Sequence, residues 1–312
     1  MVHFFDISEW EEHEYFNTGG TRDKSVVESP EDGCQYFFKT SLIKNEKHYI
    51  YEFWSEIIAS EVGTFLGFDV LHYDVALYET KLGCLSKSMT GSGSELRELW
   101  KLLKGYDPSY DIKDKNAYTF QSIEKMLKSL FPNERFIENV IETIIFDSII
   151  GNEDRHQENL SILVSNKKED KRGFIKKSNK NIVINEFSQI YDSGSSLGRE
   201  LNESKVEKML SDSNQLYAYI NRGSSEIHWD GETGKQKHFM LIERIINHGY
   251  KDFVKSVLRR LDEKYDKGKI DAIVDGIDDC LPEKLYSQKI PKKRKELIKK
   301  LISLRIERLK EL

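Results

Sequence analysis

Cysteine is scarce in this sequence, and long hydrophobic runs are absent. The three cysteines, Cys34, Cys84 and Cys280, are widely spaced and form no CxxC pair, so the sequence predicts neither a disulfide framework nor a zinc site. The longest apolar stretches, around 141–150 and 160–164, are far shorter than the roughly 20 residues that cross a bilayer. We therefore expect a protein that folds without a membrane, in a reducing compartment.

An excess of charge and a secretory leader are also missing. The net charge of -5 gives no general attraction to nucleic acid or to an anionic membrane, although one basic block lies near the C-terminus. The first residues, MVHFFDISEWEEHEY, contain no basic segment followed by an apolar run. We expect cytoplasmic synthesis, with secretion or translocation by a route without a signal peptide left open.

The chain of 312 residues is long enough for two lobes, because single cores stop growing somewhere near 250 residues. Aromatic and β-branched runs at 35–39, 71–78 and 82–89 predict strands, the last two as partners. Between the first two of these runs, apolar residues at helical spacing predict one helix that ends at Gly67. The first ninety residues therefore predict a small, mainly β lobe with one helix.

Helical periodicity dominates after a Gly/Ser-rich connector at 90–96. Two short apolar runs interrupt it, and the polar, cationic segment between them predicts a surface hairpin loop. We expect an α+β, two-lobed protein-kinase-like fold, with an N-lobe at 1–90 and a larger helical C-lobe at 91–312. The expected helices are at 94–105, 118–130, 134–150 and from about 203 to the end, and the expected strands are at 160–164 and 182–184.

A dense polar cluster, GNEDRHQENLSIL at 151–163, lies between a predicted buried helix and a predicted strand. Asp154 and Asn159 are five residues apart, so a loop can turn both toward one point, where they supply a base for a hydroxyl and a neutral oxygen ligand for magnesium. Asp192, in QIYDSGSSLG, can supply a charged ligand to the same metal. The alternative is an ordinary helix end whose Asn and Asp side chains cap backbone groups.

A second polar stretch, NTGGTRDKSVV at 17–27, has a composition suited to phosphate. Gly19 and Gly20 let backbone N–H groups approach a phosphate without a Cβ clash, and Lys24 and Ser25 follow them. By itself this pattern is weak, since most such segments are surface loops.

Lys39 ends the predicted strand QYFFK, where a cation can reach a phosphate from a rigid element. Glu56, on the following helix, can hold Lys39 by an ion pair. Glu61 competes for this role because it lies nearer the apolar stripe of the helix. We prefer Glu56.

The order of these features is that of a protein kinase: glycine turn, strand lysine, helix glutamate, connector, Asp-xxxx-Asn and a further Asp. The forms GNEDRHQENLSIL and IYD resemble the HipA-like serine/threonine kinases in a compact form, over roughly residues 17–200. Ordinary eukaryotic kinases would read H-R-D, with the His before the Asp. YDSG also departs from Asp-Phe-Gly, so their activation-loop rules are not transferred.

The resemblance implies a role for each matching residue. Asp154 would be the catalytic base and His156 would brace its loop. Asn159 and Asp192, the latter within a metal-binding segment at 190–198, would hold Mg2+. Lys39, paired with Glu56, would contact the phosphates of ATP.

The turn at 19–27 would cover these phosphates, and the resemblance makes Ser25 a candidate for regulatory autophosphorylation. The implied activity is transfer of the γ-phosphoryl group to serine or threonine of a protein substrate, including the kinase itself, with an antitoxin or host protein as a further partner. Two alternatives stay open. They are a lipid or small-alcohol kinase, and a nucleotide-binding pseudokinase or docking module.

Overall fold

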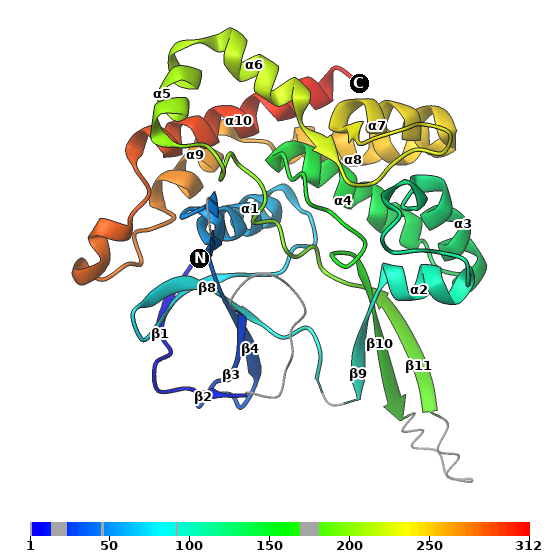
Figure 1. Ribbon diagram of the computed structural model, residues 1–312, viewed down its shortest axis with the longest axis horizontal. Helices are drawn as coiled ribbons and strands as arrows, with labels where there is room; N and C mark the ends of the chain where they lie inside the picture. The colour runs from blue at the N-terminus through cyan, green and yellow to red at the C-terminus, as the bar shows by residue number, and fades with distance from the viewer. Residues whose placement is uncertain (1, 14–23, 45–46, 92, 169–180) are drawn as a thin grey trace.

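A six-stranded sheet and one helix form the N-terminal part of the chain (Figure 1). The computed structural model describes residues 2–13, 24–44, 47–91, 93–168 and 181–312. The strand order is β1-β7-β8-β4-β3-β2, with β1 parallel to β7 and the other neighbours antiparallel. The strands are β1 (Phe4–Asp6), β2 (Glu11–Glu12), β3 (Lys24–Glu28), β4 (Gln35–Thr40), β7 (Asp74–Tyr78) and β8 (Lys81–Lys87), and a separate hairpin joins β5 (Ile43–Lys44) to β6 (Lys47–His48).

The two faces of this sheet are packed differently, because successive side chains of a strand point to opposite faces. One face carries a small core of its own, and the other packs on helix α1 (Glu52–Leu66) as part of the main core. Lys39 is paired in register with Cys84, which belongs to the α1 face. Strand alternation therefore places Lys39 toward α1. The small core consists of Ile7, Val27, Phe38, Ala76 and Leu85.

Helix α1 lies between the sheet and the helices of the C-terminal part (Figure 1). It is buried on most of its circumference, and even Glu52 and Glu56 in its first two turns are only 1% exposed. The helix ends as predicted at Gly67, which adopts the left-handed conformation with φ 84°. A helix buried in this way can hold charged side chains at a site only if other groups of the protein compensate them.

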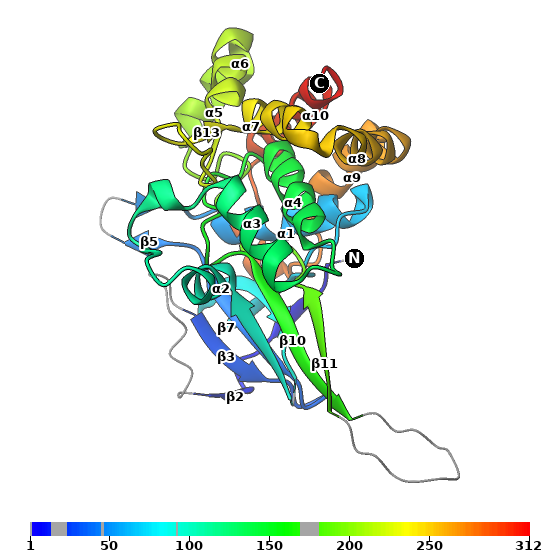
Figure 2. The same cartoon turned by 90° about the vertical axis from the view of Figure 1, so that its right-hand side faces the viewer.

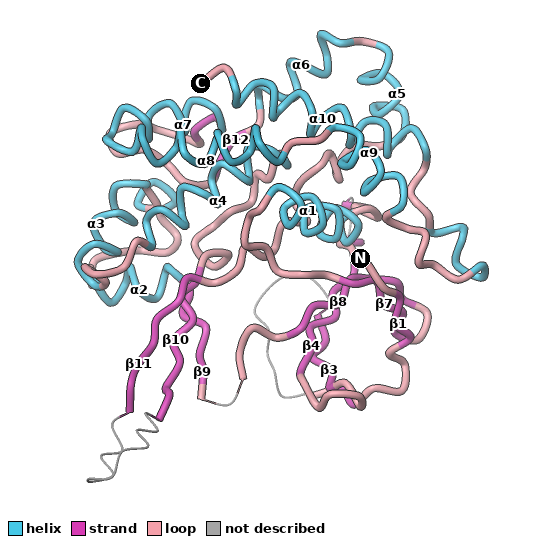
Figure 3. The backbone as a smooth tube through the Cα atoms, turned by 180° about the vertical axis from the view of Figure 1, so that it is seen from behind, coloured by secondary structure: helices cyan, strands magenta, loops and turns pink. Residues whose placement is uncertain are grey.

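The C-terminal part joins a layer of helices to a three-stranded sheet of order β11-β10-β9. The views of Figures 2 and 3 show this sheet beside the N-terminal sheet and below the helices. Its strands are β9 (Ser94–Glu98), β10 (Ser161–Lys168) and β11 (Asn181–Phe187), and the helices are α2 (Leu99–Tyr106), α3 (Phe120–Leu130), α4 (Phe136–Ile150), α5 (Glu203–Ser211), α6 (Ser213–Arg222), α7 (His238–Ile245), α8 (Lys251–Lys264), α9 (Lys267–Gly276) and α10 (Lys292–Lys310). Shorter elements are η1 (Lys115–Ala117), β12 (Ser224–Ser225), β13 (Gln236–Lys237), a π-helical turn η2 (Ile246–Tyr250) and η3 (Glu283–Gln288).

Three expectations for the local structure were wrong. The helix expected at 94–105 begins only at Leu99, because residues 94–98 pair with β10. The strand expected at 71–78 begins at Asp74. Residues 24–27, expected in a turn, belong to β3, where Val26 and Val27 are buried in the sheet.

The terminal helix α10 packs its apolar stripe on the body of the protein, which is the usual arrangement for an amphipathic helix. Its Leu297, Ile302 and Ile306 are fully buried, and α10 contacts α4, α5 and α9. Among the described residues, no helix is both long enough and apolar enough to cross a membrane. The three cysteines are free, as the sequence predicted.

Candidate active site

Lys39 lies at the junction of the two sequence segments predicted to hold a nucleotide and a metal. Its Nζ forms an ion pair with Oδ1 of Asp192 and lies 3.8 Å from Oε2 of Glu56. Both carboxylate oxygens of Glu56 are buried without a hydrogen-bond partner among the described residues. Glu61 instead lies 3.4 Å from His72. Glu56, rather than Glu61, is thus the α1 glutamate that approaches Lys39.

The hydroxyl and thiol groups around this cluster are held neutral. Burial, and then the nearby carboxylate of Glu56, raise the pKa of Tyr73 well above its ordinary value. The same two causes raise the pKa of the Cys84 thiol. Neither Tyr73 nor Cys84 therefore adds a negative charge beside Lys39.

The segment that carries Asp192 is held between the two lobes. A parallel bridge joins Val70 to Ile190, and the backbone N–H of Leu71 donates to Ile190 O at 2.9 Å. Asp192 itself adopts the left-handed conformation with φ 56°, which aspartate tolerates better than most residues. Gly194 passes close to α1, since a Cβ at this position would lie 2.7 Å from Oε2 of Glu56. Any larger residue at this position would push the side chain of Glu56 out of its place.

A buried ion pair fixes the predicted catalytic loop. The guanidinium of Arg155 donates from Nε and Nη2 to both carboxylate oxygens of Asp147 on α4, at 2.9 and 2.8 Å. It also donates to the backbone carbonyls of Asn159 and Tyr191 and to the hydroxyl of Ser193. Arg155 therefore connects α4, the predicted catalytic loop and the segment that carries Asp192.

Burial by itself lowers the pKa of Arg155, but the carboxylate of Asp147 outweighs this effect and raises the pKa above its ordinary value. The guanidinium is therefore charged at every pH at which the protein folds. Neither partner was assigned a role from the sequence. The signal was present, however, because Asp147 is an acid flanked by apolar residues in the run IIFDSII and Arg155 lies within the polar cluster.

The predicted loop residues lie together around Asp154. The amide of Asn159 donates to the backbone carbonyl of Asp154 at 3.0 Å, and its Nδ2 lies 3.3 Å from Nε2 of His156. Asn152 accepts the backbone N–H of Asp154 at 3.2 Å. One carboxylate oxygen of Asp154, Oδ2, accepts a hydrogen bond from the hydroxyl of Ser195 at 3.2 Å. No motif in the sequence singled out Ser195 by itself.

The predicted phosphate-binding turn is placed only in part. Gly19 and Gly20 lie outside the described residues. Lys24 is the cross-strand partner of Lys39 and therefore lies on the same face of the sheet. Ser25 is the partner of Phe38, on the opposite face, and its hydroxyl helps to lower the pKa of Glu12. The structure does not bring Ser25 to Lys39.

The donor set suits magnesium with a nucleotide. Among the described residues, no three His, Cys, Asp or Glu side chains converge to hold a metal by themselves. Mg2+ in phosphoryl-transfer sites needs fewer protein ligands, because it binds through one or two carboxylates together with phosphate oxygens. Asp192 supplies a carboxylate, and Asn159, whose Nδ2 is engaged by the loop backbone, supplies Oδ1. Lys39, which lies within reach of two carboxylates, would supply a cation for phosphate.

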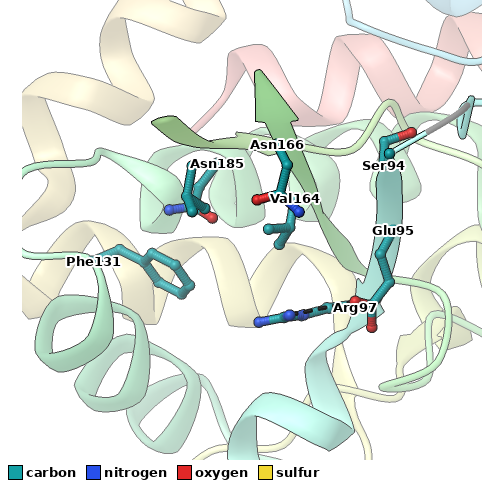
Figure 4. A pocket seen from close by; sticks show the side chains of 9 residues that line it. Ser94, Glu95, Arg97, Phe131, Val164, Asn166 and Asn185 are labelled. Atoms are coloured by element: carbon teal, nitrogen blue, oxygen red, sulfur yellow. Dashed lines mark hydrogen bonds and ion pairs between the residues drawn. The ribbon is translucent and has the colours of Figure 1, made fainter. Parts of the chain in front are cut away.

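A cavity of about 440 Å3 lies elsewhere, at the three-stranded sheet (Figure 4). Its charged pair is the ion pair Arg97–Glu95 at 3.3 Å, with both side chains about half exposed. Exposed pairs of this kind add little to stability, whereas Lys39 and Glu56 are buried and, with Asp192, join both lobes. We therefore place the candidate active site at Lys39, Asp154 and Asp192. The cavity is lined by Gly93, Ser94, Glu95, Arg97, Phe131, Val164, Asn166, Val183 and Asn185.

A β lobe with a buried strand lysine, joined to a helical lobe with an Asp-xxxx-Asn loop, defines the two-lobed fold of HipA-like kinases, as predicted from the sequence. No family model and no curated protein matches the sequence. Among solved structures, the chain is similar to the Helicobacter pylori proinflammatory kinase CtkA, with 19% identity and a TM-score of 0.74 over 100% of this chain and 98% of that one. It is also similar to Shewanella oneidensis MR-1 HipA, solved with HipB and its operator DNA, with 10% identity and a TM-score of 0.50 over 98% of this chain and 67% of that one. At these identities the likeness shows the fold.

Proposed function

We propose that this chain is an ATP- and Mg2+-dependent protein kinase of HipA-like type that transfers the γ-phosphoryl group to serine or threonine. The observation that carries the proposal is the cluster of Asp192 with the buried Lys39 and Glu56, next to the loop of Asp154 and Asn159. The HipA-like fold supports it. A nucleotide-binding module without catalysis would need no carboxylate at the acceptor position.

Each side chain has a distinct part in this proposal. Lys39 binds the phosphates, and Glu56 keeps its ammonium in place on the α1 face of the sheet. Asp154 orients the acceptor hydroxyl and takes its proton. Asn159 and Asp192 hold Mg2+, which when bound neutralises charge on the phosphates. His156 positions the amide of Asn159.

Arg155 has a positioning role in the proposed reaction. It contacts neither the acceptor nor the phosphates, but it holds the backbone of Asn159 and of Tyr191, the residue before Asp192. The two proposed metal ligands come from segments that are 33 residues apart in sequence. A shift of about 1 Å in a catalytic group can reduce a rate by about 100-fold, so a rigid connection between these segments matters for transfer.

The proposed partners are a protein with a serine or threonine acceptor and an antitoxin or host protein. The Shewanella HipA structure contains HipB and operator DNA. For this chain, a net charge of -5 gives no reason to expect direct DNA binding.

The test is transfer of labelled phosphate from ATP with Mg2+, with protein and lipid acceptors offered side by side. The native protein is compared with Asp154→Asn, with Asp192→Asn and with the control Asp230→Asn, which alters an exposed residue. Transfer to a protein or to the chain itself, lost in the first two variants and kept in the control, supports the proposal. Transfer to lipid alone would assign the chain to the lipid-kinase alternative. ATP binding without any transfer would assign it to the pseudokinase alternative.

A further inference from the structure

The carboxylate of Asp154 already holds a hydroxyl of the protein itself. Ser195 donates from Oγ to Asp154 Oδ2 at 3.2 Å, and Nη2 of Arg199 donates to the same Ser195 oxygen at 2.9 Å. Ser195 is partly exposed. A catalytic carboxylate must lie within hydrogen-bond reach of the hydroxyl that it activates. Ser195 meets this geometric requirement without any movement of the chain.

Ser195 is also tethered close to the proposed phosphate site. It follows Asp192 by three residues, and three residues span at most about 11 Å even when fully extended. Asp192 is in direct contact with Lys39. The backbone of Ser195 is therefore at most about 11 Å from that of the residue that contacts Lys39, the cation proposed to bind the phosphates.

The two neighbouring serines are engaged differently. Ser193 is buried, and its hydroxyl oxygen accepts a hydrogen bond from Arg155 at 3.2 Å. Ser196 is 1% exposed and donates to the backbone carbonyl of Ser193 at 2.6 Å. Within this serine-rich segment, Ser195 is the residue whose hydroxyl reaches the carboxylate of Asp154. Ser196, the next residue in the chain, therefore provides a matched control for Ser195.

We infer that Ser195 is a phosphoryl acceptor for this chain's own active site, modified within the same molecule. The inference rests on the proposed kinase function. In this step Asp154 takes the proton of Ser195 Oγ, the Oγ–phosphorus bond forms, and the bond from the γ-phosphorus to the bridging oxygen breaks. ADP carries away the electron pair of that bond. The products are a phosphoserine and ADP.

The modified residue would change a contact between the lobes. Arg199 donates to Oε1 of Glu52, on α1, at 2.6 Å and stacks over the ring of Tyr49. A phosphoserine carries a charge of about -1.5 to -2 and binds arginine through charge-assisted hydrogen bonds. The phosphate on Ser195 would therefore compete with Glu52 for Arg199. It would also place negative charge beside Asp154, which disfavours a second acceptor at the same position.

The experiment incubates the full chain with ATP and Mg2+ and locates phosphate by fragment-ion mass spectrometry. We expect phosphate on Ser195 in the native protein and in Ser196→Ala, and none there in Asp154→Asn or Ser195→Ala. Because the reaction is intramolecular, its half-time should be unchanged by a tenfold dilution of the protein. The phosphorylated residues found in the native chain decide the question even if Ser195→Ala fails to fold.

The outcomes separate this inference from the proposed function. Transfer to a protein acceptor or to other residues of the chain, with Ser195 unmodified, would overturn the inference and leave the kinase function standing. Phosphate on Ser195 with a half-time that lengthens on dilution would overturn modification within the same molecule. No transfer to any acceptor would overturn both.

Discussion

Replacing Arg155 with methionine would leave the carboxylate of Asp147 buried without its cation. Asp147 has a side-chain exposure of 3%, and Arg155 of 0%. Removing one partner of a buried ion pair typically costs about 3–5 kcal/mol, because the remaining charge cannot be solvated. This corresponds to a decrease of about 10²- to 10⁴-fold in the ratio of folded to unfolded protein. Against a total stability of about 5–15 kcal/mol, Arg155→Met should be among the most destabilising single changes in the chain.

The measurement is urea-induced unfolding followed by circular dichroism, with Arg135→Met as the matched control. Arg135 also forms an ion pair, with Glu138, but its side chain is 79% exposed. Its loss should cost less than about 1 kcal/mol. If Arg155→Met costs no more than Arg135→Met, the reasoning on the buried pair is wrong.

A double variant tests the cause of the loss. In Arg155→Met with Asp147→Leu, both charges are replaced by apolar side chains, so the stranded carboxylate is removed. Part of the lost stability should return, although the amide of Asn152 then loses its acceptor Oδ1 of Asp147. A double variant less stable than Arg155→Met would show that the charge of Asp147 is not what destabilises the single variant.

Three further predictions use the same kind of matched comparison. Glu56→Gln should lower the rate of phosphoryl transfer by about 10- to 100-fold, because Lys39 would be held less firmly. Glu61→Gln, the control, should leave the rate unchanged. Equal rates for the two variants would show that Glu56 is not part of the site. Gly194→Ala should lower the free energy of unfolding, measured with urea, by about 1–3 kcal/mol, because the added Cβ meets Glu56. Gly105→Ala, within α2 and with open space around it, should instead raise the free energy of unfolding by about 0.5–1 kcal/mol. Asp74 and then Glu61 raise the pKa of His72 to about 9. The stability that His72 contributes is therefore complete below about pH 6.5 and is lost as the pH rises through about 9. This contribution is small because the side chain is half exposed, and the unfolding free energy of His72→Gln should lack this part of the pH dependence.

The elements that could be predicted from sequence are those whose pattern is local. Helices α1, α3 and α4 and strands β4 and β8 follow from apolar spacing and from terminating residues such as Gly67. Strand β9 could not be predicted in this way, because residues 94–98 become a strand by pairing with β10, more than 60 residues later in the chain. The sequence of β9 contains little that favours a strand over the first turn of α2.

The site shows the same division between local and distant information. The spacing of Asp154 and Asn159 is local, and the structure brings them together. The choice between Glu56 and Glu61 depends on how α1 is rotated against the sheet, which the helical wheel alone left open. The contact between Arg155 and Asp147 joins the interior of a helix to a loop, and it exists only after the chain folds. Sequence reasoning can propose the reacting groups more easily than the groups that hold them.

The charges of this site are arranged at a cost to stability. Glu56 is buried with both carboxylate oxygens lacking a hydrogen bond among the described residues, and a buried polar group without a hydrogen bond typically costs about 1–3 kcal/mol. Lys39 compensates it only at 3.8 Å, because its ammonium is in closer contact with Asp192. An apolar side chain at position 56 would pack α1 on the sheet without this penalty. A penalty of this kind, next to Asp154 and at the junction of two lobes, is what a site kept for binding a charged ligand is expected to show.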